Sequence, residues 1–233
     1  MNKSILCAIS MRAGSKGVKN KNFKLINGKP LMYYTIKQAI KSKIFDKIIV
    51  STDSKKILKM AKSYGADGWF LRPKALSSST SQKPPVIKHA LLKAEKFYNK
   101  KFDIIFDLDV TSPLRKIEDI KNAYNFFIKK NANLLLSGCK SKKNPYFNMV
   151  EVINGKLKRV KKFKRNIYRR QDAPITFDCN ASIYIWRRKS LINFKSFYTE
   201  KTVFYEMPES RSIDIDSNFD FKLVEFLLKE KNI

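Results

Sequence analysis

The first 140 residues alternate short apolar runs with amphipathic stretches, and this alternation restricts the possible folds more than any other feature. The apolar runs that are typical of strands lie at 4–10, 47–52, 69–71, 102–109 and 133–139. The stretches with apolar residues at helical spacing lie at 30–43, 54–65, 86–98 and 117–130. Apolar strands that alternate with helices are typical of a parallel sheet covered on both faces. We therefore predict an α/β fold.

The regular alternation ends after residue 139, which indicates an excursion from the core sheet. Residues 147–160 alternate around Asn154-Gly155, a pair that favours a tight β-hairpin. The remaining elements are expected as strands at 181–188 and 203–208 and as a capped amphipathic helix at 217–231. We predict one domain over residues 1–233, in which the segment from about 140 to 180 forms a small lobe.

The chain of 233 residues carries 49 lysines and arginines against 20 acidic residues, a net charge of +29. Clustered cations bind phosphates, so a basic nucleic-acid-binding protein is one interpretation. Only ten of the cations are arginines, and the lysines are spread over the whole chain, as on a solvated surface. The densest basic stretch, 156–170, is the best candidate for a positive patch. The sequence contains no helix-turn-helix or zinc-finger pattern, which argues against nucleic acid as the partner.

The lengths of the apolar runs and the spacing of the cysteines indicate the cellular location of the protein. No apolar run is long enough to span a bilayer, and the stretch MNKSILCAIS becomes charged too soon for a signal peptide. Cys7, Cys139 and Cys179 lack the spacing of a metal or redox motif. We expect a cytoplasmic protein with reduced cysteines and no membrane insertion.

The stretch SMRAGSKGVKNKN, residues 10–22, follows the first predicted strand, where ligands bind in open α/β sheets. Gly14 and Gly17 permit tight turns, and Ser15 and backbone N–H groups can donate to phosphate oxygens. The basic residues that could neutralise a triphosphate are Arg12, Lys16 and Lys21. The order of residues is neither a Walker A loop nor GxGxxG. A flexible basic loop without a ligand is the alternative interpretation.

Polar residues also follow the later strands. Asp53 could meet a ribose, a base or a metal, or it could be a turn residue before a helix. Arg72 begins the polar loop 71–84, which could wrap a nucleobase or be a plain surface loop. The central strand ends in DLDVTSPLR, with the polar residues Asp107, Asp109, Thr111, Ser112 and Arg115. Polar residues at such a strand end commonly face a ligand.

The stretch SIDID carries Asp214 and Asp216, which point to the same side of an extended segment. Two carboxylates together with substrate phosphates suit Mg²⁺. The alternative is a solvated strand face, with Asp216 as a helix cap. A single histidine, His89, lies between apolar neighbours of a predicted helix and is expected to be structural. Zinc chemistry and histidine-based catalytic triads are therefore excluded.

Seven blocks occur in the order found in the acylneuraminate cytidylyltransferases, which the chain resembles over nearly its whole length. The blocks are RAGSKGVKNKN, IIVSTDS, LRP, TSPLR, RRQDAP, NASIYIW and SIDID followed by a helix. The family comprises CMP-sialic acid synthetases and relatives that act on legionaminic and related nonulosonic acids. The resemblance implies a Rossmann-like nucleotidyltransferase fold with a mostly parallel sheet, and a homodimer. It also implies transfer of CMP from CTP to the anomeric hydroxyl of an acidic nine-carbon sugar, with Mg²⁺ and release of pyrophosphate.

The resemblance assigns roles to individual residues by position. The residues implied at the triphosphate and cytidine are Arg12, Ser15, Lys16, Lys21 and Asn22, with Arg72 and Ser81 at the base and ribose. The residues implied near the sugar are Asp109, Thr111, Ser112, Arg170, Gln171 and Asn180. Asp214 and Asp216 would hold the metal. The resemblance implies a catalytic contribution from Lys16, Lys21, Asp214 and Arg170, with Arg170 at the sugar carboxylate. The lobe near 140–180 would mediate dimerisation and reach over the partner's active site.

Two departures from the family pattern concern the sugar. Asp109 stands where the sialic acid enzymes have a glutamine of the sugar pocket, and NPYFN (144–148) lacks a lysine that the family can offer to the carboxylate. We therefore expect an acidic sugar related to sialic acid. A 3-deoxy-octulosonate-type sugar is the alternative substrate.

Overall fold

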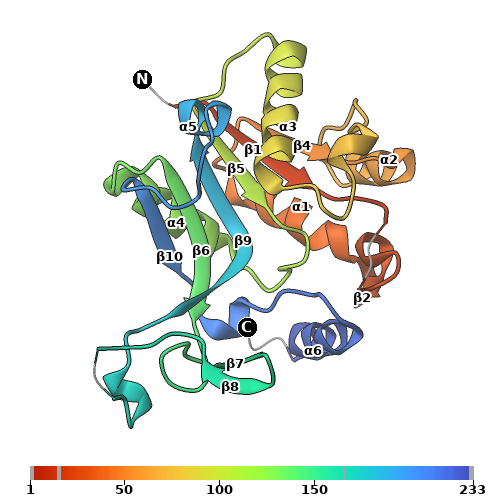
Figure 1. Cartoon of the computed structure of the whole chain (residues 1–233). Coiled ribbons are helices and arrows are strands. Elements are labelled where there is room, and N and C mark those ends of the chain that lie inside the picture. Colours follow the sequence, from red (N-terminus) through yellow and green to blue (C-terminus); the bar gives the residue numbers. More distant parts are fainter. Residues whose placement is uncertain (1–2, 15–16, 165, 231–233) are drawn as a thin grey trace.

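The core of the molecule is a six-stranded sheet in the order β10-β6-β9-β5-β1-β4 (Figure 1). Residues 3–14, 17–164 and 166–230 are described in a computed structural model of the chain. The strands are β1 (Ile5–Ser10), β4 (Lys47–Ser51), β5 (Ile104–Leu108), β6 (Leu134–Lys140), β9 (Phe177–Arg187) and β10 (Thr202–Glu206). β9 runs antiparallel to β5 and β6, and the other neighbouring strands are parallel. The predicted α/β fold with a mostly parallel sheet is confirmed.

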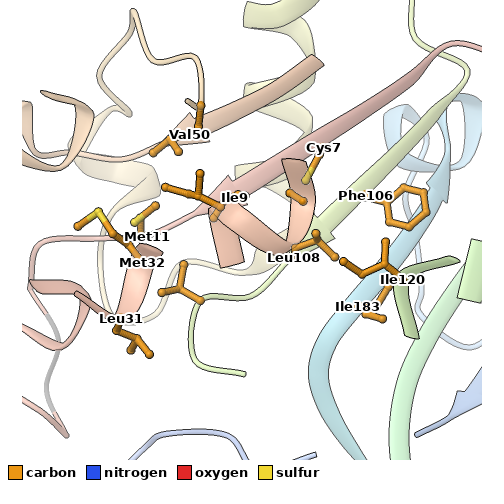
Figure 2. Close-up of a cluster of buried hydrophobic side chains, with 14 of the residues drawn as sticks. Cys7, Ile9, Met11, Leu31, Met32, Val50, Phe106, Leu108, Ile120 and Ile183 are labelled. Atoms are coloured by element: carbon orange, nitrogen blue, oxygen red, sulfur yellow. The ribbon is translucent and has the colours of Figure 1, made fainter. Parts of the chain in front are cut away.

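Helices cover both faces of this sheet. They are α1 (Leu31–Ser42), α2 (Lys55–Ser63), α3 (Lys83–Tyr98), α4 (Ile117–Lys129), α5 (Arg188–Ile192) and α6 (Asn218–Lys229). Successive side chains of a strand point to opposite faces. Cys7 and Ile9 of β1 accordingly join a cluster with residues of α1, α2, α4 and α6, whereas Leu6 and Ala8 join a second cluster with α3 and α5. Figure 2 shows the first cluster, with Met32 of α1 and Ile120 of α4 among its labelled residues.

Local side-chain bonds fix the starts of two helices, and the last helix is capped as predicted, by Ser217 and not by Asp216. Ser54 Oγ accepts the Ile57 N–H at 3.3 Å and caps α2. Ser217 Oγ accepts the Asp220 N–H at 3.2 Å, while the Asp220 carboxylate accepts the Ser217 N–H at 2.7 Å. This reciprocal pair is a capping box, which satisfies two backbone donors at the start of α6.

Some predicted boundaries are wrong. Residues 69–71 do not form a strand: only isolated bridges join Asp67 to Ile49 and Leu71 to Thr52. α3 begins at Lys83 instead of residue 86, because Pro84 and Pro85 fit the first turn of a helix. β9 begins at Phe177 instead of residue 181. A two-residue ladder between β2 (Leu25–Ile26) and β3 (Lys29–Pro30) was not predicted, although Asn27-Gly28 between them is the same hairpin signal as Asn154-Gly155.

The excursion between β6 and β9 carries the predicted hairpin. β7 (Val150–Ile153) pairs with β8 (Lys156–Arg159), and Asn154 and Gly155 turn between them with φ of 51° and 71°. Figure 1 shows this hairpin away from the sheet, at the end of the molecule where α6 lies. The eight residues of its two strands are all exposed. A dimerisation role for this lobe stays a prediction. Across the described ranges, no helix combines the length and the apolar character needed to cross a membrane.

Candidate active site

A cleft of about 500 Å³ lies at the carboxyl ends of β1 and β5. Its walls come from the loop after β1, the segment 72–81, the start of α3, the loop after β5 and Asp216. The backbone connects these parts: the Met11 N–H donates to the Ser51 carbonyl, and Ile215 N–H donates to the Thr111 carbonyl, both at 3.0 Å. The fold therefore brings the first loop, the central strand end and the late acidic stretch to one place.

One wall of the cleft is cationic and carries Arg12, Lys21 and Arg72. Arg72 is buried, and its Nε donates to Ser77 Oγ at 3.1 Å. Burial lowers the pKa of Arg72, whereas the nearby Asp53 carboxylate raises it. Lys21 Nζ donates to the Ile215 carbonyl and lies 3.4 Å from Asp216 Oδ1. Such a wall fits the charge of several phosphate groups.

Two polar side chains hold the loop after β1 in place. Asn22 lines the cleft and is buried, with its Nδ2 donating to the Arg12 carbonyl at 2.8 Å. Asp53 Oδ1 accepts the Ala13 N–H at 2.8 Å, so this carboxylate holds the backbone of the loop. Ser15 and Lys16, predicted as nucleotide contacts, lie outside the described residues. Ser81 lines the cleft on the opposite side and donates to the Ala75 carbonyl at 3.2 Å.

The acidic stretch 213–216 adjoins the cationic wall at Lys21. Ile215 is fully buried, while Asp216 lines the cleft and its side chain is 80% exposed. Asp214 is half-buried, and burial together with the neighbouring Asp109 and Asp216 carboxylates raises its pKa to about 6. Its Oδ1 is buried and makes no hydrogen bond to any part of the chain that the structure describes. A buried acceptor without a donor, next to a second carboxylate, suits a hard divalent cation such as Mg²⁺.

The described ranges contain no group of three or more His, Cys, Asp and Glu side chains arranged for a metal. Mg²⁺ commonly takes one or two protein carboxylates and completes its ligands with substrate phosphates and water. Asp214 and Asp216 therefore fit Mg²⁺ in the presence of a nucleotide, whereas a site made of protein ligands alone would be incomplete.

The end of β5 carries a cluster that the sequence did not signal. Lys83 Nζ, from the first turn of α3, lies 3.0 Å from Asp107 Oδ2 and 2.8 Å from Asp109 Oδ2. Lys83 and Asp109 line the cleft, and Asp107 is buried behind them. Thr111, also in the lining, donates its hydroxyl to Asp109 Oδ1 at 2.9 Å. The two aspartates at positions i and i+2 could have indicated a shared cation, but the sequence does not indicate which of its 39 lysines supplies it.

Three residues expected near a ligand are instead buried in the protein. Ser112 donates to the Asn180 carbonyl at 3.4 Å, and Asn180 Oδ1 accepts the Ser137 hydroxyl at 2.7 Å. Arg115 is 1% exposed and donates to the Ser182 carbonyl at 2.6 Å and to Thr35 Oγ1 at 3.1 Å. These residues support the loop after β5 and are not among the described residues that line the cleft.

Arg170 and Gln171 lie elsewhere in this chain. They line a separate groove of about 480 Å³ in the lobe, together with Asn144 and residues 173–176. Arg170 Nη2 donates to the Ser141 carbonyl at 2.7 Å. Within one chain, the structure therefore does not bring these two predicted sugar contacts to the cleft that holds Arg12 and Asp216.

Comparisons with known proteins find relatives over nearly the whole chain. The family model described as Cytidylyltransferase matches residues 6–233. The chain is 44% identical to the CMP-N,N'-diacetyllegionaminic acid synthase of Campylobacter jejuni, over 98% of this chain and 97% of that protein. It is 33% identical to an N-acylneuraminate cytidylyltransferase of Streptococcus agalactiae, over 93% of this chain and 51% of the relative. A solved CMP:2-keto-3-deoxy-manno-octonic acid synthetase complexed with CTP has a TM-score of 0.71 at 14% identity, covering 98% of this chain and all of its own.

Proposed function

The chain belongs to the cytidylyltransferase family and is a nucleotidyltransferase, and from this premise we propose that it transfers CMP from CTP to a nonulosonic acid. The sugar we propose is of the legionaminic or sialic type, because relatives of 44% and 33% identity carry those names. The likeness to the octonic acid synthetase, at 14% identity, concerns the fold alone. This likeness does not favour a 3-deoxy-octulosonate-type sugar, which is the second candidate substrate.

The observation that carries the proposal is the meeting of opposite charges in one cleft. Arg12, Lys21 and Arg72 line the cleft as cations, Asp216 lines it as a carboxylate next to Lys21, and Asp214 lies close to both Asp216 and Asp109. A triphosphate fits against the cations, and its reacting phosphate would then lie toward the acids. Transfer of this kind depends on positioning and on neutralisation of charge more than on covalent help from the protein.

In the proposed reaction, the anomeric hydroxyl of the sugar attacks the α-phosphorus of CTP in line. A new bond forms between the hydroxyl oxygen and the α-phosphorus, and the bond from the α-phosphorus to the oxygen that bridges to the β-phosphate breaks. Pyrophosphate leaves with that oxygen, and the proton of the hydroxyl passes to solvent. Lys21 offsets the charge that develops on the leaving phosphates. Asp214 and Asp216 would hold Mg²⁺. This ion, when bound, neutralises phosphate oxygens and lowers the pKa of a coordinated hydroxyl.

The lobe suggests how the remaining sugar contacts are supplied. Arg170 and Gln171 line a groove in the excursion, apart from the cleft of their own chain. We propose that two chains associate through the lobe and that each Arg170 contacts the sugar carboxylate in the partner's cleft. Exposed apolar side chains on the hairpin, among them Val152 and Leu157, support an interface there. We also propose a cytoplasmic location, which the three free cysteines support.

The proposal is tested by a substrate panel. Each of the four nucleoside triphosphates is combined with sialic, legionaminic and 3-deoxy-octulosonic acids, and pyrophosphate release is measured with and without Mg²⁺. The nucleic-acid alternative makes a different prediction, namely a steep salt dependence of affinity for duplex DNA or RNA. The net charge of +29 is the only observation that favours that alternative.

A further inference from the structure

The cluster of Lys83, Asp107 and Asp109 combines one cation with two carboxylates beside the cleft. The Lys83 side chain is 32% exposed, and those of Asp109 and Asp107 are 20% and 1% exposed. Burial alone would lower the pKa of Lys83, but the two carboxylates raise it above its ordinary value. Lys83 is therefore a permanent cation whose position is fixed from two sides.

The donors of Lys83 are already engaged by the protein. Its ammonium has three N–H groups. Two carboxylate oxygens lie within 3.0 Å, and the Ala181 carbonyl lies at 3.5 Å. Ala181 has a φ of 52°, a left-handed conformation that is rare outside glycine, and it lies where the ladder of β6 and β9 shifts register. A substrate anion would have to displace these acceptors, so Lys83 acts on the substrate through its neighbour Asp109.

The contacts of Asp109 determine which of its oxygens can bind a ligand and how. Oδ1 accepts the backbone N–H of Thr111 at 3.1 Å and its hydroxyl at 2.9 Å, and Oδ2 accepts Lys83 at 2.8 Å. These donors outweigh burial and lower the pKa of Asp109 to about 2. An ionised carboxylate only accepts hydrogen bonds, and it has room for about four. Three of these positions are occupied, and Asp109 lines the cleft, where a ligand can reach the carboxylate.

This arrangement limits the groups that can face Asp109. A phosphate or a sugar carboxylate would meet a like charge at Asp109, so the triphosphate belongs beside Arg12, Lys21 and Arg72 and the sugar carboxylate points away from Asp109. A hydroxyl or an amide N–H of the sugar can donate to Asp109. An asparagine at this position would have to turn its NH₂ toward either the Lys83 ammonium or the Thr111 donors.

We propose that Lys83 is a positioning residue that holds the Asp109 carboxylate in the cleft as a pure hydrogen-bond acceptor. Asp109 thereby selects sugar acids that present a hydroxyl or amide N–H donor at this point. The inference rests on the proposed function, transfer of CMP to a sugar acid. It adds Lys83 as a positioning residue and a chemical requirement on the sugar.

The test uses the sugar acid that the wild-type enzyme converts best and a set of its analogues. In each analogue, one hydroxyl or acylamino group is replaced by hydrogen. A site that hydrogen-bonds a donor group of the substrate rejects an analogue that lacks this group. The kcat/KM of at least one analogue should therefore be about a hundredfold or more below that of the parent sugar. In the variants Lys83→Met and Asp109→Asn, the kcat/KM values for the same analogue and for the parent sugar should differ by less than about tenfold. The losses for the other analogues should be unchanged.

Controls separate positioning from folding and from nucleotide binding. Lys93→Met removes an exposed lysine from the same helix and should keep the wild-type ratio. Lys83→Arg retains the cation and should restore most of the selectivity. The Kd for CTP should stay within about twofold in every variant, because in this proposal Asp109 contacts the sugar and not the nucleotide. If Lys83→Met does not fold, Asp109→Asn alone tests the inference, since it keeps the volume of the side chain.

Two results would overturn the inference. One is an unchanged ratio of parent to analogue in both Lys83→Met and Asp109→Asn. The other is a loss of CTP affinity as large as the loss of sugar turnover, which would assign Asp109 to the nucleotide. A wild-type protein that makes no product from CTP with any sugar acid would overturn the proposed function itself, and this inference with it.

Discussion

Gly17, in the loop after β1, lies directly against the backbone carbonyl of Asp216 near the other end of the chain. A Cβ atom on Gly17 would come within 2.0 Å of that oxygen and 3.2 Å of the carbonyl carbon. Lys21, four residues further on, donates to the Ile215 carbonyl. The nucleotide loop and the acidic stretch therefore share one contact surface, and the width of the cleft depends on the absence of a side chain at position 17.

This contact predicts a sharp difference between two glycine substitutions. Gly17→Ala should force the loop and Asp216 apart and reduce kcat/KM for CTP by roughly a hundredfold, because a small displacement of binding groups costs about that much. Gly14→Ala is the matched control, because its Cβ would meet nothing within 4 Å among the described residues. Steady-state kinetics of both variants check this, and equal activities would show that the contact at Gly17 is unimportant.

Asp214 should be needed for turnover and not for binding of CTP. Replacing it with asparagine keeps the size of the side chain and removes the charge. We expect kcat to fall at least about a hundredfold and the Kd for CTP to stay within a few-fold. Glu209→Gln removes an exposed carboxylate shortly before Asp214 and should leave kcat unchanged. A kcat near that of the wild type in Asp214→Asn would remove this residue from the reaction.

The same substitution should stabilise the protein in the absence of metal. The pKa of Asp214 is raised from 3.8 to about 6 by burial and by two neighbouring carboxylates. A raised carboxyl pKa means that ionisation costs stability, so the penalty grows as pH rises from about 4 through about 6 and is complete above that. With a chelator at pH 8, Asp214→Asn should therefore have a higher Tm than the wild type.

Two further conditions make the stability prediction specific. The Tm difference should shrink as the pH falls toward 4, where Asp214 is protonated in the wild type. In the presence of CTP at pH 8, addition of Mg²⁺ should raise the Tm of the wild type further and have little additional effect on Asp214→Asn. A Tm difference that is independent of both pH and Mg²⁺ would contradict a cation-binding role for this carboxylate.

The position of Arg170 predicts complementation between subunits. If each Arg170 serves the partner's cleft, a dimer of one Arg170→Ala chain and one Asp214→Asn chain contains one intact site. An equimolar mixture that exchanges subunits should then recover about a quarter of the wild-type activity, although each variant alone is inactive. Recovery is measured by pyrophosphate release after mixing. No recovery in a mixture with confirmed mixed dimers would show that Arg170 acts within its own chain.

The sequence predicts the parts of this fold that depend on local patterns. The strands β1, β4, β5 and β6 are continuous apolar runs, and Ser54 and Ser217 are capping residues, so their positions follow from the sequence. Residues 69–71 are also apolar, but the Trp69 ring stacks on Phe97 at 4.1 Å, and packing takes the place of strand pairing. The direction of β9 depends on how the lobe returns to the sheet, which no local pattern encodes.

The same distinction holds for the site. Arg12, Lys21, Arg72 and Asp216 follow recognisable strand ends or motifs, and the fold brings them to one cleft. Lys83 gave no signal, because its partners Asp107 and Asp109 lie on a different element and only the packing of α3 on the sheet brings them together. Ser112 and Asn180 are part of recognisable motifs, but their side chains bond to the protein.

The most direct test of the central claim is to identify the product made from CTP and a nonulosonic acid. Purified protein is incubated with CTP, Mg²⁺ and either a legionaminic-type acid, sialic acid or a 3-deoxy-octulosonic acid, and the mixture is analysed for pyrophosphate and the CMP-sugar. Equal amounts of pyrophosphate and a CMP-nonulosonate, with CTP preferred over the other triphosphates, are the result we predict. Product from the octulosonic acid alone, from another triphosphate alone, or from none of them would contradict the account.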